Sequence, residues 1–162
     1  MEHQAAFRQA RASDLPAIVA MLADDALGAA RERVSDPLPE SYATAFAHID
    51  ADPNNELIVA ERDGIVVAMM QLTYIPSLSY QGSWRALIES VRVHGSMRGR
   101  GLGHALIHHA VERARARGCG MVQLTTHKSR TDAHRFYQDL GFVASHEGMK
   151  RMLDTPARAQ DV

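Results

Sequence analysis

Residues 84–103, WRALIESVRVHGSMRGRGLG, contain a strand pattern, a glycine-rich loop and the start of a helix in direct succession. The segment from Trp84 to Val93 is typical of a β-strand, and Leu102 to Arg117 has the length and composition of a helix closed by Gly118. Where a glycine-rich loop leads into a helix, backbone N–H groups and the positive end of the helix dipole can converge on an anion. This stretch therefore predicts an anion-binding loop.

The loop itself reads Arg98-Gly99-Arg100-Gly101-Leu102-Gly103. Its two arginines can add charge-assisted hydrogen bonds, which suits a pyrophosphate better than a single carboxylate. No Gly-Lys-Ser/Thr follows, so it is not a Walker loop, and it lacks the G-x-G-x-x-G spacing of dinucleotide-binding folds. The alternative is a helix start that is glycine-rich for structural reasons alone.

Alternating elements are expected on both sides of this stretch. Before it we expect a strand at Ala6 to Ala12, an amphipathic helix carrying Leu15, Ile18, Val19 and Leu22, a loop at Asp25 to Pro39, a helix at Glu40 to about Asp50, and antiparallel strands at Glu56 to Glu61 and Ile65 to Ile75. After it we expect a strand at Met121 to Thr126, a helix at Ala133 to Leu140, and short strands at Val143 to Ser145 and Met149 to Leu153. The order predicts an α/β (α+β) fold, with a mixed, mostly antiparallel central sheet of about six to seven strands flanked by about four helices.

The composition is that of an ordinary globular protein. The chain has 162 residues, with 18 Lys and Arg against 19 Asp and Glu, and only two of the basic residues are lysines, Lys128 and Lys150. This length predicts a single domain over residues 1–155, followed by a polar tail at 156–162. The near-neutral charge argues against a nucleic-acid partner. A polar N-terminus and the lack of a long apolar run argue against a membrane partner and favour the cytoplasm.

Two motifs resemble the signatures of the GNAT superfamily of acyl-CoA-dependent N-acyltransferases. Arg98-x-x-Gly101-x-Gly103 matches the [Q/R]-x-x-G-x-[G/A] signature of that family. Downstream, Ala133-x-x-Phe136-Tyr137-x-x-Leu140-Gly141-Phe142 is similar to the element that closes the family's cofactor site. The resemblance implies a GNAT-like sheet that splays between its fourth and fifth strands, with acetyl-CoA as co-substrate and no metal.

The same resemblance implies roles for individual residues. The amides of Arg98, Gly99, Arg100, Gly101, Leu102 and Gly103 would bind the pyrophosphate, and the backbone of Val91, Arg92 and Val93 would pair with the pantetheine arm. Ala133 would lie in the second part of the cofactor site. Arg130 departs from the family, which often has Asn or Ser there, so we expect Arg130 to meet a phosphate instead.

Acyl transfer to an amine needs a base for the ammonium proton and benefits from an acid for the leaving thiolate. Strand alternation places Glu89 with Leu87 and Val91 among apolar neighbours, which would raise its pKa and make it the base, unless a β-bulge changes the phase or Glu89 is a surface residue. The resemblance makes Tyr137 the acid, since a phenol can donate to a thiolate of similar basicity. The alternative for Tyr137 is a core tyrosine.

Several other residues have weaker claims. His127 is an alternative base, while His104, His108 and Glu112 have a spacing that can bind metal but are more typical of a solvated helix face. Cys119 is expected to be a small apolar residue rather than a nucleophile.

The predicted function is transfer of an acetyl group to the primary amine of a small molecule. The resemblance to the family also implies a homodimer. The substrate pocket would involve the segments at 25–40, 76–84 and 146–150, and acids such as Asp24, Asp25, Asp36 and Glu40 would attract a cationic amine. The alternatives are an enzyme that acetylates protein N-termini or lysines, a non-catalytic acyl-CoA sensor or partner protein, and a nucleotide-binding domain.

Overall fold

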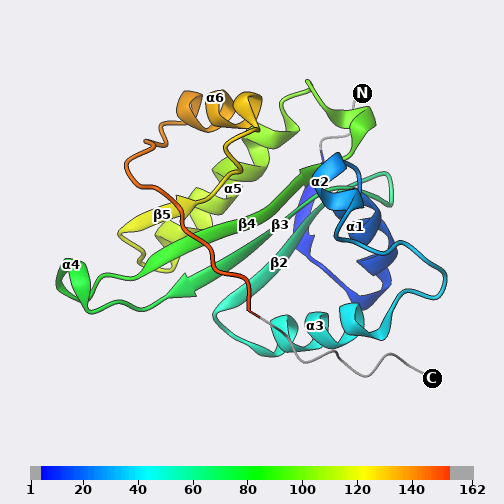
Figure 1. The fold of residues 1–162 in the computed structure, drawn as a ribbon. Coiled ribbons are helices and arrows are strands. Elements are labelled where there is room, and N and C mark those ends of the chain that lie inside the picture. The colour runs from blue at the N-terminus through cyan, green and yellow to red at the C-terminus, as the bar shows by residue number, and fades with distance from the viewer. Residues whose placement is uncertain (1–4, 154–162) are drawn as a thin grey trace. The chain divides into compact units, whose positions relative to one another are not determined.

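The computed structural model describes residues 5–153 and divides after Leu124 into two compact units (Figure 1). The first unit contains β1 (Ala6–Gln9), α1 (Leu15–Leu22), α2 (Ala26–Ala29), α3 (Glu40–Ala51), β2 (Asn55–Arg62), β3 (Ile65–Ile75), α4 (Ser79–Gly82), β4 (Arg85–Val93), α5 (Leu102–Ala116) and β5 (Met121–Leu124). The second contains α6 (Thr131–Asp139). Within the described range, no helix is both long and apolar enough to cross a membrane.

The sheet has five strands in the order β1-β2-β3-β4-β5. Each neighbouring pair from β1 to β4 is antiparallel, and β4 pairs with β5 in parallel. The turn between β2 and β3 is formed by Asp63 and Gly64 with φ of 52° and 78°, as suits a tight hairpin with a right-handed twist. The α/β fold and the mixed, mostly antiparallel sheet predicted from the sequence are confirmed.

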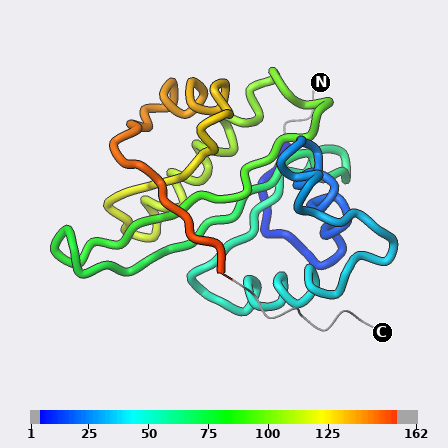
Figure 2. The backbone as a smooth tube through the Cα atoms, viewed as in Figure 1, coloured from blue at the N-terminus to red at the C-terminus, as the bar shows by residue number. Residues whose placement is uncertain are grey.

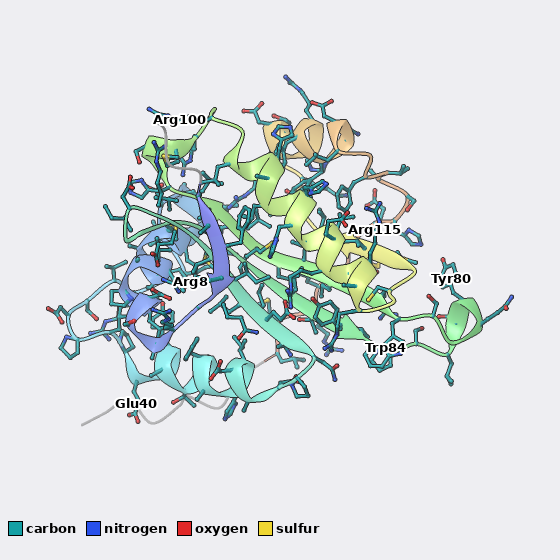
Figure 3. The ribbon with its side chains drawn as sticks, turned by 180° about the vertical axis from the view of Figure 1, so that it is seen from behind. Arg8, Glu40, Tyr80, Trp84, Arg100 and Arg115 are labelled. Carbon is teal, nitrogen blue, oxygen red and sulfur yellow. The ribbon has the colours of Figure 1, made fainter. Side chains whose placement is uncertain are left out.

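Helices cover both faces of this sheet. On one face α5 lies across the strands (Figure 3) and contacts β3, β4 and β5. Its inward residues are fully or almost fully buried: Leu102, Leu106, Ile107, Ala110 and Ala114. On the other face, α1 contributes Ile18 and Met21 to a buried cluster, and α3 packs against it. The other members of the cluster are Ala10, Leu57, Val59 and Met69. The predicted apolar face of α1 is therefore the one that it buries.

The connection between β3 and β4 extends from the sheet as an arm with α4 at its tip (Figure 2). Tyr80 and Gln81 in α4 have φ of 52° and 58°. Both residues are therefore in the left-handed conformation, and this segment is not a regular helix. Leu78 and Tyr80 are 97% and 72% exposed. The arm carries apolar side chains that no described residue covers.

The predicted strand count is wrong. The stretches at 143–145 and 149–153 form no strand, and Val143 and Met149 are 83% and 94% exposed, so the apolar residues that suggested strands bury little surface there. The strand expected at 6–12 ends at Gln9, because Ala12–Asp14 form a 3₁₀ turn. The single domain over 1–155 stays a prediction, and the tail at 156–162 lies outside the described residues.

A carboxylate joins β1 to the start of α1. Asp14 is 8% exposed and accepts hydrogen bonds from both terminal nitrogens of Arg8, at 2.7 and 3.0 Å, and from the Arg11 N–H at 2.7 Å. The hydrogen bonds from Arg8 lower the pKa of Asp14, despite the opposing effect of burial. Arg8 also donates to Glu61 at 2.8 Å, so the same guanidinium connects β1, β2 and the helix start.

We predict that Asp14→Ala lowers the free energy of unfolding by about 2 kcal/mol, because a buried charge-assisted network loses its acceptor. Asp14→Asn keeps an acceptor for the Arg11 N–H, so it should cost about half as much. Urea denaturation measures both, with Asp50→Asn on the exposed face of α3 as the control.

The sign of the pH dependence follows from the lowered pKa of Asp14. A carboxyl group with a lowered pKa in the folded state stabilises the fold above its unfolded pKa of about 4, and loses that contribution as the pH falls through the folded value. The difference in stability between wild type and Asp14→Asn should therefore be constant above about pH 5 and shrink as the pH falls from about 5 to about 2. A difference that stays constant over that range would contradict this assignment.

Candidate active site

The two halves of β4 differ in how they are paired. The ladder with β5 runs from Arg85↔Met121 to Ile88↔Leu124 and ends there, whereas β3 remains paired with β4 as far as Ala68↔Val93. Residues 89–93 therefore have a strand neighbour on one edge only within the first unit. The ladder ends where β5 itself ends, at Leu124, so the splaying of the fourth and fifth strands that the family resemblance implies stays a prediction.

A β-bulge lies where the pairing changes. The register shifts from Gln71↔Glu89 to Met69↔Arg92, so one residue of β3 faces two of β4, and Ser90 has φ of 55°. A positive φ is costly for a residue other than glycine and is found most often in bulges and at functional sites. Simple alternation predicts that Glu89 shares a face with Val91. Because the bulge changes the phase, Glu89 instead shares a face with Arg92.

The expected apolar surroundings of Glu89 are also wrong. Glu89 is exposed and lies opposite Gln71. Gln71 and Thr73 donate from their side chains to the Asn55 side-chain oxygen, at 3.1 and 2.8 Å. Beyond the apolar cluster that ends at Met69, this face of the sheet thus presents carboxylate, amide and hydroxyl groups beside the half-buried Leu87, which lies opposite Thr73.

The glycine-rich loop follows β4 directly. A 3₁₀ turn at Gly95–Met97 leads to Arg98, and Gly99 and Gly101 then take φ of 72° and 77°. A Cβ at either glycine would meet no atom within 4 Å, so backbone conformation rather than space requires glycine there.

The loop is also anchored at one end and accessible at the other. Leu102 is 7% exposed and fixes the start of α5 in the core, while the loop from Arg98 to Gly101 is exposed. The first N–H groups of a helix have no carbonyl partner within it, and a helix of this length adds its positive dipole end. The geometry therefore provides accessible amide donors where the sequence predicts the pyrophosphate site.

Two arginines, one in the loop and one on β4 before it, contact acids from the connection between α1 and α2. Arg98 donates through Nη2 to Asp24 at 2.7 Å and through Nε to the Val93 carbonyl at 3.2 Å. Arg92 donates to the Val91 carbonyl at 2.9 Å, and its Nη2 lies 3.9 Å from Asp25. The structure thus brings together the predicted residues at 91–93, the loop and two acids that the sequence suggested only as attractants for an amine.

The second motif forms a compact element in the second unit. Arg130 caps α6, and Ala133 and Tyr137 lie on the helix, partly buried. The Tyr137 ring makes edge contacts with Phe136 at 5.0 Å and Phe142 at 5.9 Å between ring centroids. Gly141, with φ of 86°, turns the chain so that the Phe142 N–H donates to the Tyr137 carbonyl at 3.0 Å. Tyr137 belongs to the second unit and Glu89 to the first, so their joint action as acid and base stays a prediction.

The remaining candidates have ordinary surroundings. His104, His108 and Glu112 are exposed on α5, and Glu112 forms an ion pair with Arg115. Over the part of the chain that the structure describes, no three His, Cys, Asp or Glu side chains are grouped as a metal site would require. Burial raises the pKa of the Cys119 thiol, which disfavours the nucleophilic thiolate. His127 binds Ser129 at 2.7 Å on an exposed turn.

Sequence reasoning did not identify the most distinctive residues of this site. Ser90 and Gln71 acquire their positions from the pairing of β3 with β4, and no local sequence signal marks either residue. The contacts of Asp24 and Asp25 connect residues that are far apart in the chain. The only sequence signal for these contacts was the succession of two acids, Asp24 and Asp25, before a helix.

Known proteins that resemble this chain share this arrangement of elements. Residues 16–142 match the model of the acetyltransferase (GNAT) family. Over 107 residues, covering 66% of this chain and 69% of the relative, the chain is 35% identical to the aminoalkylphosphonate N-acetyltransferase of Salmonella typhimurium.

Solved structures show the same fold. A protein of Bacillus halodurans C-125, described as a transcriptional regulator, is 54% identical, with a TM-score of 0.90 over 93% of this chain and 100% of that one. An acetyltransferase of Trypanosoma brucei is 27% identical, with a TM-score of 0.75 over 93% of this chain and 100% of that one. With the family match over most of its length, this chain belongs to the GNAT family and is an acetyl-CoA-dependent N-acetyltransferase.

Proposed function

We propose that the enzyme moves the acetyl group of acetyl-CoA to the primary amine of a small molecule by direct attack, with Glu89 as general base and Tyr137 as general acid. The observation that carries the proposal is the edge of β4 at residues 89–93, which has no strand neighbour within the first unit and is followed, after one 3₁₀ turn, by the glycine loop at the start of α5. A strand edge offers backbone groups to an extended amide-containing arm, and the loop offers amides to phosphate.

The chain's own groups suit this co-substrate. The amides from Arg98 to Gly103 would hold the pyrophosphate, and the backbone of residues 91–93 would pair with the pantetheine arm. In the second unit, Arg130 and Ala133 would complete the site. When bound, the co-substrate supplies an acetyl group as a thioester, which an unprotonated amine can attack.

The two proposed catalytic side chains have complementary roles in acyl transfer. The Glu89 carboxylate takes a proton from the substrate ammonium, directly or through water, and so exposes the nitrogen lone pair. As the new C–N bond forms and the C–S bond breaks, the Tyr137 hydroxyl gives its proton to the leaving sulfur, and the proton that the nitrogen loses on becoming an amide restores the hydroxyl, directly or through water. No covalent enzyme intermediate is needed, which leaves Cys119 without a role.

A small aminoalkyl acceptor is favoured over a protein. The relative at 35% identity is an aminoalkylphosphonate N-acetyltransferase, and the face around Glu89 carries hydrogen-bonding groups from Gln71, Thr73 and Asn55. We further propose that the enzyme works in the cytoplasm as a homodimer, with neither nucleic acid nor a membrane as a partner.

The proposal predicts which amines release coenzyme A thiol from acetyl-CoA. In a panel of aminoalkylphosphonates, amino acids, polyamines and short peptides, kcat/KM should be highest for an aminoalkyl compound of low molecular weight. A dye that reacts with the released thiol measures the rate. If peptides with free N-termini or lysines were the better substrates, the acceptor would be a protein, as in the alternative function.

We predict that Glu89→Gln lowers kcat with the best acceptor by about a hundredfold, since a positioned base contributes about 10²–10⁴ to the rate. The remaining rate should rise steeply with pH, because only the already unprotonated amine then reacts. Glu112→Gln on the exposed face of α5 is the matched control. A full rate with an unchanged pH profile in Glu89→Gln would remove Glu89 from the mechanism.

We predict that Tyr137→Phe lowers kcat by at least about tenfold and leaves the KM for acetyl-CoA nearly unchanged, because the hydroxyl acts on the leaving group. Phenylalanine keeps the ring contacts with Phe136 and Phe142, so the helix should remain intact. Tyr80→Phe, at the exposed tip of the arm, is the matched control. Equal kcat in Tyr137→Phe and wild type would show that the hydroxyl transfers no proton.

A further inference from the structure

Arg98, the first residue of the proposed pyrophosphate loop, forms an ion pair in the described structure. Its Nη2 lies 2.7 Å from the Asp24 carboxylate, and the two side chains are 57% and 51% exposed. The residues are 74 positions apart in the chain, so this contact links the loop to the connection between α1 and α2. The Arg98 guanidinium is thus already paired with the Asp24 carboxylate, and it lies next to amides that are proposed to bind another anion.

Asp24 comes from a firmly held backbone. Its neighbour Asp25 accepts a hydrogen bond from the Gly28 N–H at 2.7 Å and lies 3.9 Å from Arg92. Gly28 is buried, and a Cβ there would overlap the Leu22 carbonyl, so α2 is packed tightly against the end of α1. Asp24 therefore cannot follow Arg98 far if the arginine moves.

Arg98 is held less firmly. Its Nε donates to the Val93 carbonyl at 3.2 Å, but the head group is more than half exposed on a long side chain. It lies immediately before Gly99 and Gly101, whose positive φ values shape the loop. A diphosphate on the loop amides would bring two negative charges close to this guanidinium, against the single charge of Asp24.

We propose that Asp24 and the coenzyme A diphosphate compete for Arg98, so that the ion pair is a latch which binding of the co-substrate opens. This inference rests on the proposed function of the loop. An exposed ion pair contributes little, so the diphosphate prevails, at the cost of a weaker affinity than the loop alone would give. Opening the latch releases the Asp24 carboxylate on the connection between α1 and α2.

The latch couples two regions of the enzyme. The co-substrate loop and the segment at 25–40, expected to help form the acceptor pocket, respond to the same contact. Because coupling between two binding events is reciprocal, a cationic acceptor that favours the released Asp24 would also tighten the binding of coenzyme A.

Titration calorimetry of the full chain with coenzyme A tests the latch. Asp24→Asn should bind coenzyme A about threefold more tightly than wild type, the effect expected from removing an exposed pair of this kind. Arg98→Gln should bind more weakly, and adding Asp24→Asn to it should cause no further change. Asp63→Asn is the matched control, because Asp63 also forms an exposed pair with an arginine, Arg62, at 3.8 Å.

The outcomes separate the latch from the proposed function. Unchanged or weaker binding in Asp24→Asn would overturn the latch, and so would a tightening that persists in the Arg98→Gln background or equals that of Asp63→Asn. If the wild type failed to bind coenzyme A at all, the assignment of the loop would be wrong, and the latch with it.

Discussion

Among the described strands of the first unit, β4 has a neighbour on only one edge beyond Ile88, and the proposed chemistry of this unit depends on that constraint. A strand in the middle of a sheet normally satisfies its backbone groups on both sides. Here the ladder with β5 ends at Ile88↔Leu124 while β4 continues to Val93. The bulge at Ser90 coincides with this change and re-aims the side chains that follow it. A protein that leaves such an edge open in its own fold can offer it to a ligand.

The open edge is useful only because α5 holds its position. Its inward residues are buried against the sheet, and Arg113 forms two hydrogen bonds with Glu56, a buried carboxylate on β2. These contacts fix the helix, and with it the loop that precedes Leu102. Because Glu56 is buried, this ion pair favours one docking position of the helix: a shift would leave a buried carboxylate without its partner.

The sequence was sufficient to predict helices and strands wherever a local pattern determines them. The bounds of β3 were predicted without error, and α3 and α5 within one residue, because periodicity and turn residues act over a few positions. The loop at 98–103 was recognisable for the same reason. Glu89 and Arg92 show the limit, because their shared face depends on one extra residue in a ladder that forms between distant segments. The pairs with Asp24 and Asp25 likewise exist only after folding, and the apolar pattern at 143–153 gave no information on whether a neighbouring strand would be present.

The choice of arginine over lysine has a chemical consequence of its own. The only lysines, Lys128 and Lys150, lie outside the first unit, and Lys128 pairs with Glu147 at 2.7 Å. A lysine amine becomes a nucleophile when it loses its proton, whereas a guanidinium stays protonated and does not attack a thioester. The arginines around the loop therefore keep their charge for the phosphates and cannot themselves be acylated by the co-substrate. The enzyme is protected from its own donor by the residue type that supplies its charge.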